Sequence, residues 1–105
     1  KYILGSINYV DPSNVICSPC FTDAMEGKIN KEDLLFIDLS IVDEVKNNQV
    51  YILNINNNLC LGQIHTTPRK TMFVQANAKY SSYHLPANYT VIGKVLSVVP
   101  KVVYF

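Results

Sequence analysis

The chain has no long apolar run, which bears first on membranes. None of its hydrophobic stretches approaches the roughly 18 residues that a membrane-spanning helix needs. A secretory signal is not recognisable, because the apolar residues at the start are followed at once by Gly5 and Ser6. We therefore expect a cytoplasmic protein with no membrane partner.

Strong net charge is also lacking. The formal net charge is +1, so the chain does not carry the basic footprint of a nucleic-acid-binding domain. Acidic residues are missing from the second half, since every Asp and Glu lies between Asp11 and Glu44. Six of the nine Lys and Arg residues follow Glu44. Such asymmetry is able to steer a head-to-tail or partner contact, although uneven surface charge alone rarely identifies a partner.

Cysteine is sparse, and its odd count of three fits reduced thiols better than a disulfide framework. Cys17-Ser-Pro-Cys20 has the spacing of a redox motif, but a thioredoxin-like site needs a helix where residues 16–21 indicate an irregular strand. A zinc site built from Cys17, Cys20, Cys60 and His65 lacks a second close-spaced ligand pair. We expect no metal and no cofactor, and a redox or metal module is the weakest of three functional hypotheses.

What the sequence does contain is a series of short β-prone runs between turn clusters. Hydrophobic residues make up 49% of the 105 residues and charged residues 16%, which suits one compact domain over 1–105. The expected strands cover 15–21, 34–39, 49–55, 59–65, 71–76, 89–99 and 101–105, with an edge strand or arm at 2–10 and a loop at 77–88. Pro19 places its strand at a sheet edge or a bulge. The sequence predicts a mainly β fold of short antiparallel strands with at most one helical turn, at 22–27.

Several segments, in this order, resemble the LexA and phage CI-type repressors, the self-cleaving proteins of peptidase family S24. They are Thr22-Asp23-Ala24-Met25 with Glu32-Asp33 and the apolar strand that follows, Asn48-Gln49-Val50, Leu59-Cys60-Leu61-Gly62-Gln63-Ile64, Gln75-Ala76-Asn77-Ala78-Lys79-Tyr80 and Val91-Ile92-Gly93-Lys94-Val95. The resemblance implies the small β fold of the family's C-terminal domain. It also implies where the Ser-Lys catalytic dyad would lie.

The family's nucleophilic serine falls at Ala24, and on an ungapped alignment its general-base lysine falls at Gly62. Alanine has no group that attacks a carbonyl, and glycine cannot accept the serine proton. The resemblance therefore implies a pseudo-protease that is not an enzyme. Ala24 is either natural or engineered. Natural loss is favoured, because replacing one member of a dyad is nearly sufficient to stop cleavage. An engineered protein would therefore not need a second change at Gly62.

The other residues of these motifs have structural interpretations. Asp23 is a helix N-cap candidate beside Thr22, Met25 is expected to pack in the core beneath the turn, and Asp33 is expected to cap a turn. If Asn56 and Asn57 form a two-residue hairpin turn, Tyr51 lies opposite Gly62, where its ring can cover the missing side chain. We therefore expect the former active cleft to be filled or flattened.

The C-terminal run is apolar and β-prone, so it either closes the sheet or pairs with another copy. In the resembled repressors the late strands form a two-fold interface, which implies the following interface candidates: Val98, Val99, Val102, Val103, Tyr104 and Phe105. Tyr80, Tyr83 and Tyr89 form either an aromatic lid over the core or further interface anchors.

Two main functional hypotheses result. The first is a non-catalytic dimerisation or oligomerisation domain of a prophage-type repressor, which forms homo-dimers or higher homo-oligomers. Because the chain begins at Lys1 rather than Met, we expect an upstream helix-turn-helix domain to make the DNA contacts, and an antirepressor is a possible partner. The second is a self-cleaving autoprotease, LexA-like or UmuD-like, whose nucleophile is mutated to Ala.

Overall fold

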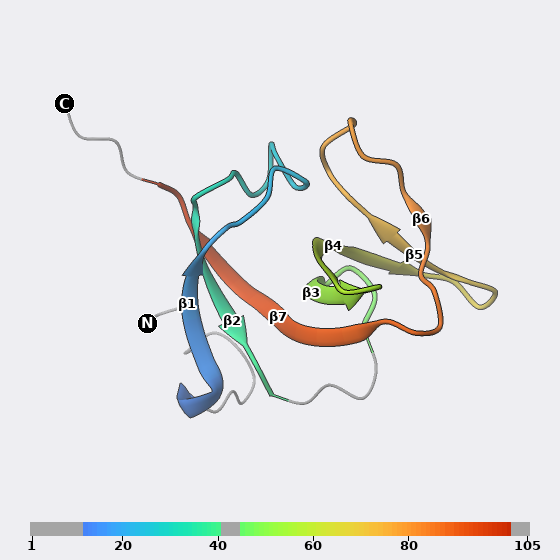
Figure 1. Ribbon diagram of the computed structural model, residues 1–105, viewed down its shortest axis with the longest axis horizontal. Helices are drawn as coiled ribbons and strands as arrows, with labels where there is room; N and C mark the ends of the chain where they lie inside the picture. Colours follow the sequence, from blue (N-terminus) through green and yellow to red (C-terminus); the bar gives the residue numbers. More distant parts are fainter. Residues whose placement is uncertain (1–11, 41–44, 102–105) are drawn as a thin grey trace.

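The computed structural model describes residues 12–40 and 45–101 (Figure 1). Its elements are a 3-10 turn, η1 (Pro12–Asn14), and the strands β1 (Val15–Pro19), β2 (Leu34–Asp38), β3 (Val50–Ile55), β4 (Asn58–Thr66), β5 (Thr71–Val74), β6 (Tyr83–His84) and β7 (Thr90–Val99). All strand pairs are antiparallel, and they form one seven-stranded sheet in the order β1-β2-β7-β3-β4-β5-β6. The mainly β prediction is confirmed. The described residues contain no helix long and apolar enough to cross a membrane.

Strand β7 joins the two parts of the sheet. Its second half, from Lys94 to Val99, pairs with β2, and its first half, from Thr90 to Lys94, pairs with β3. The register shifts once in each pairing, and such bulges bend a strand and increase its twist. Figure 1 shows β7 curving from the side of β3 to the side of β2. The bend allows the two parts of the sheet to enclose a core.

The β3–β4 hairpin closes through Asn56 and Asn57, as the sequence predicts. Both residues have positive φ, 53° and 67°, and Ile55 pairs with Asn58 across the turn. Two central residues with positive φ match the right-handed twist of the flanking strands, and Asn tolerates this conformation better than most residues. This turn sets the register in which Tyr51 pairs with Gly62.

Two predicted strands end earlier than the sequence indicated. β1 stops at Pro19, and it lies at the edge of the sheet as this proline predicted. β5 stops at Val74, because the next residues turn away to contact the Thr22–Met25 segment. The expected loop at 77–88 holds one short strand, β6. The predicted segments at 2–10 and 102–105 lie outside the described residues.

Strand β3 is buried on both faces and separates two hydrophobic clusters. The first core cluster lies between the β2–β7 side and the 20–33 segment, and its buried members are Cys20, Met25, Ile29, Leu35, Ile37, Ile52 and Leu61. The second core cluster contains Tyr51, Leu53, Ile55, Ile64 and Phe73. Because alternate residues of a strand point to opposite faces, β3 supplies both clusters. It can do so because it is apolar at nearly every position.

Candidate functional site

The Thr22–Met25 turn is the first part of the candidate site. It belongs to the connection between β1 and β2, which is closed by two backbone hydrogen bonds. The Cys20 N–H donates to the Asp33 carbonyl at 2.7 Å, and the Glu32 N–H donates to the Cys20 carbonyl at 2.9 Å. Inside this connection Ala24 and Met25 are buried, with 2% and 1% of their surface exposed. The Thr22 hydroxyl accepts a hydrogen bond from the Ala24 N–H at 3.2 Å, so Thr22 caps the turn.

The segment after β5 forms hydrogen bonds to this turn. The Asn77 N–H donates to the Ala24 carbonyl at 3.0 Å, and the Asn77 side-chain amide donates to the Asp23 carbonyl at 2.9 Å. The Ala76 N–H points at the Met25 sulfur, 3.3 Å away. Met25 therefore packs in the first core cluster and also accepts a hydrogen bond. These contacts fix residue 24 against a part of the chain more than 50 positions away.

The Asp23 carboxylate is the centre of a small polar network on the same segment. The Tyr80 hydroxyl donates to Asp23 Oδ1 at 2.5 Å, and Lys79 Nζ lies 3.0 Å from Asp23 Oδ2. The hydrogen bond from Tyr80, followed by that from Lys79, lowers the pKa of Asp23 below its ordinary value. The same carboxylate raises the pKa of both Tyr80 and Lys79. Asp23 is thus held ionised, as an anchor between the turn and the 77–80 segment.

Asp33 is the one buried polar or charged side chain among the described residues, with 6% of its surface exposed. Its Oδ1 accepts from the Lys101 N–H and its Oδ2 from the Asn30 N–H, both at 2.9 Å. These two backbone donors, Lys101 first, lower the pKa of Asp33. Glu32 beside it pairs with Lys101 Nζ at 2.6 Å. Asp33 therefore closes a turn at Asn30 and also ties the end of β7 to the β1–β2 connection.

Gly62 is buried in β4, opposite Tyr51 on β3. A Cβ added to Gly62 would lie 2.6 Å from Cζ of Phe73 and 2.8 Å from both of its Cε atoms. The atoms nearest to that place are therefore those of Phe73 and not those of Tyr51, the residue expected to cover this glycine. The nearest cover is Phe73 from β5, which sits diagonally to Gly62 because its own partner is Ile64. Tyr51 is fully buried instead, and its hydroxyl accepts a hydrogen bond from the Lys46 N–H at 2.9 Å.

The interface candidates are spread over different environments. Val98 packs against the first core cluster, whereas Val99 is 39% exposed. Val102, Val103, Tyr104 and Phe105 lie outside the described residues. Of the three tyrosines, Tyr89 packs on the second core cluster, and the ring centroid of Tyr83 lies 5.8 Å from that of Phe73.

Sequence analysis missed the roles of Asn77, Lys79 and Phe73. For Asn77 and Tyr80 a signal exists, because both lie in the 75–80 segment, which is one of the segments that carry the family resemblance. For Phe73 there is no such signal, since its position over Gly62 depends on the pairing of β4 with β5.

The side chains at the two predicted dyad positions carry no polar atom. Residue 24 offers only a methyl group and residue 62 no side chain. In the described parts of the chain no group of His, Cys, Asp and Glu side chains has the arrangement of a metal site, and Cys17, Cys20 and Cys60 are free thiols.

Comparison with known proteins agrees with the arrangement of these segments. A family model described as Peptidase S24-like matches residues 2–96. No curated protein matches the chain. The match spans the turn that carries Ala24, the strand that carries Gly62 and residues 90–96 of β7.

Proposed function

The chain belongs to the Peptidase S24-like family, and from this membership we propose that it is a non-catalytic dimerisation or oligomerisation domain of a prophage-type transcriptional repressor. Peptidase activity in this family depends on a serine and a lysine. On the alignment of the motifs, these positions hold Ala24 and Gly62. The domain then works by binding and not by catalysis.

The observation that carries the proposal is the Phe73 ring over Gly62. Its closest atom lies 2.6 Å from the place of a Cβ, so a lysine side chain could not enter this position unless the ring moved. Phe73 is fully buried in the second core cluster, which makes such a movement costly. Gly62 is buried in the core, and the turn at residue 24 is anchored to Asn77 and Tyr80, which supports a non-catalytic role. This combination is expected of a domain that retains the fold of the family without its peptidase activity.

In this proposal the domain acts through a second copy of itself in the cytoplasm. Dimerisation would tether two upstream helix-turn-helix domains, so that binding of one operator half-site raises the effective concentration at the other. DNA is contacted only through those domains, in line with the net charge of +1. Because self-cleavage is excluded in this proposal, induction would require an antirepressor protein or another binding event.

Sedimentation equilibrium tests the proposal directly. The chain is expected to associate reversibly at micromolar concentrations, with a mass of two or more copies of 11.8 kDa. A strict monomer at several hundred micromolar would end the oligomerisation proposal.

The alternative is an autoprotease whose nucleophile has been replaced by alanine. The anchored turn favours it, because Asn77 still fixes the backbone of residue 24 as a working site would require. The test is an Ala24→Ser variant of the longer protein that contains this domain, incubated at alkaline pH and separately treated with a serine-reactive fluorophosphonate. We expect no cleavage and no labelling. The controls are the parent protein and an Ala24→Cys variant. Cleavage or labelling of Ala24→Ser that neither control shows would favour the alternative.

A further inference from the structure

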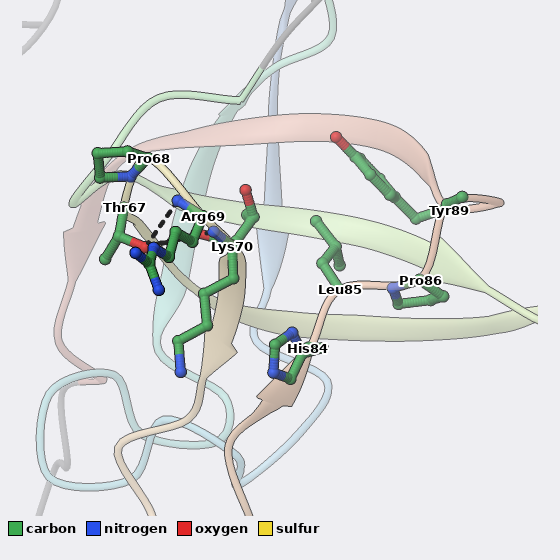
Figure 2. Close-up of a pocket in the computed structure, with 10 residues that line it drawn as sticks. Thr67, Pro68, Arg69, Lys70, His84, Leu85, Pro86 and Tyr89 are labelled. Carbon is green, nitrogen blue, oxygen red and sulfur yellow. Dashed lines mark hydrogen bonds between the residues drawn. The ribbon is translucent and has the colours of Figure 1, made fainter.

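A pocket of about 460 Å³ lies between the β4–β5 turn and the segment that follows β6 (Figure 2). Its lining comes from residues 67–71 on one side and from 84–87 with Tyr89 on the other. This volume falls in the range of pockets that bind ligands. The pocket is far in sequence from the Ala24 turn, and the proposed function does not use it.

The pocket is basic. Arg69 and Lys70 are exposed on the turn, and His84 faces the pocket from β6. Within the described residues, the ion pairs involve Lys79 and Lys101, so neither Arg69 nor Lys70 has an acidic partner there. No acid lines the pocket, and none occurs in the sequence after Glu44. The positive charge of Arg69 and Lys70 is therefore not neutralised by any acidic residue that lines the pocket.

The walls of the pocket are held in place by hydrogen bonds and packing. The turn is closed by the Thr67 N–H to the Lys70 carbonyl at 2.8 Å, and the Leu85 N–H donates to the Thr71 carbonyl at 2.9 Å, which links the two sides. Leu85 and Tyr89 pack against the second core cluster. Together with Pro86 they form the apolar part of the wall opposite the turn that carries Arg69 and Lys70 (Figure 2).

We propose that this pocket binds an acidic, apolar-containing peptide segment of a partner protein. A carboxylate of the segment would pair with Arg69 and Lys70, and a neighbouring apolar side chain would pack on Leu85 and Tyr89. Arginine suits this role because its planar guanidinium binds a carboxylate through two parallel hydrogen bonds, and Arg and Tyr are the residue types enriched in interface hot spots. A nucleic acid fits less well, since it needs a continuous basic stripe and the chain has a pI near 7.9.

The experiment is a titration of the ¹⁵N-labelled chain with a synthetic nonapeptide of alternating Glu and Leu residues, followed by amide chemical shifts. We expect shifts concentrated at 67–71 and 84–89, and weaker binding in 300 mM than in 50 mM NaCl. The double variant Arg69→Glu/Lys70→Glu should weaken binding about tenfold or more. The matched control is Lys28→Glu/Lys31→Glu, which makes the same change in charge at two exposed lysines of the first half and should leave binding nearly unchanged. The spectra also report whether each variant is folded.

Other outcomes would overturn the proposal. A peptide in which Gln replaces Glu should bind poorly, so equal binding of that peptide would rule out the charge pairing. Equal or stronger shifts at the pocket with inorganic phosphate or a DNA duplex would identify a general anion site instead. Loss of self-association in the Arg69→Glu/Lys70→Glu variant would show that the occupant is a second copy of the chain. These results are distinguishable from failure of the proposed function, because a monomer can still bind the peptide at this pocket.

Discussion

At the scale of single residues, position 62 shows that a missing side chain can be a packing requirement. Gly62→Ala places a Cβ 2.6 Å from the Phe73 ring, so the ring or the strand must move. We expect this substitution to lower the free energy of unfolding by about 1–3 kcal/mol, as overpacking of a core usually does. Urea denaturation measures the change.

The control uses the smaller side chain Leu at position 73. In a Phe73→Leu background the added Cβ has more room, and its cost should fall below about 1 kcal/mol, which a double-mutant cycle detects as coupling. An equal cost of Gly62→Ala in both backgrounds would mean that Phe73 is not what excludes a side chain.

Asp33 predicts a dependence of stability on pH. Its pKa is lowered in the folded state by the N–H groups of Lys101 and Asn30, so its contribution is complete above the ordinary carboxyl pKa of about 4. That contribution is lost as the pH falls through the lower pKa of the folded state. Thermal unfolding between pH 2 and 7 should therefore show a steeper acid loss for the natural chain than for Asp33→Asn.

Salt separates this effect from the surface ion pairs. The Lys101–Glu32 pair is exposed and the Lys79–Asp23 pair is partly exposed, so both should be screened in 0.5 M NaCl, whereas the Asp33 bonds to backbone N–H groups should persist. If the two proteins lose stability in parallel across the acid range, Asp33 is not the group responsible.

At the scale of elements, the β3–β4 hairpin determines which residues face each other. Asn56 and Asn57 both have positive φ, a conformation that costs a residue with an ordinary side chain about 1 kcal/mol or more. We expect Asn57→Ala to destabilise the domain by about 1 kcal/mol and Asn57→Gly to be neutral or stabilising. Denaturation curves of the two variants give opposite signs if the turn has this geometry. A stabilising Asn57→Ala would contradict it.

The connection between β1 and β2 is organised differently, because its partners lie far along the chain. Thr22 caps the turn locally, but the Ala24 and Asp23 carbonyls are satisfied by Asn77 and the Asp23 carboxylate by Tyr80. Buried or half-buried polar groups need such partners, so this connection and the 75–80 segment depend on each other for their conformations. The element that carries residue 24 is therefore fixed only when the sheet is assembled.

At the scale of the whole molecule, self-association can be localised with charged substitutions. Val99, at the end of β7, is 39% exposed and belongs to the C-terminal run in which the family resemblance implies the interface. Val99→Glu should weaken association about tenfold or more in sedimentation equilibrium, since a buried unpaired charge disfavours an apolar interface.

Leu59→Glu is the matched control. Leu59 is 56% exposed on β4 and lies outside the C-terminal run, so its substitution should leave association unchanged. Equal effects at both positions, or an effect at Leu59 alone, would move the interface away from the end of β7.

The fold class, the hairpin turn at Asn56–Asn57 with its Tyr51–Gly62 register, and the family could all be predicted from the sequence. These features follow from local signals, namely alternating β-prone runs, turn residues with a defined φ and motifs in a fixed order, each of which is readable over a few neighbouring residues.

The surroundings of Ala24 and Gly62 could not be predicted, because they depend on the tertiary structure. Phe73 covers Gly62 because β5 pairs with β4 in one register, and Asp23 meets Tyr80 because two segments 57 positions apart are brought together by the curled sheet. The basic pocket between 67–71 and 84–89 arises in the same way, from the link between Thr71 and Leu85. Such contacts depend on strand pairing and on the bend of β7, which local preferences do not specify.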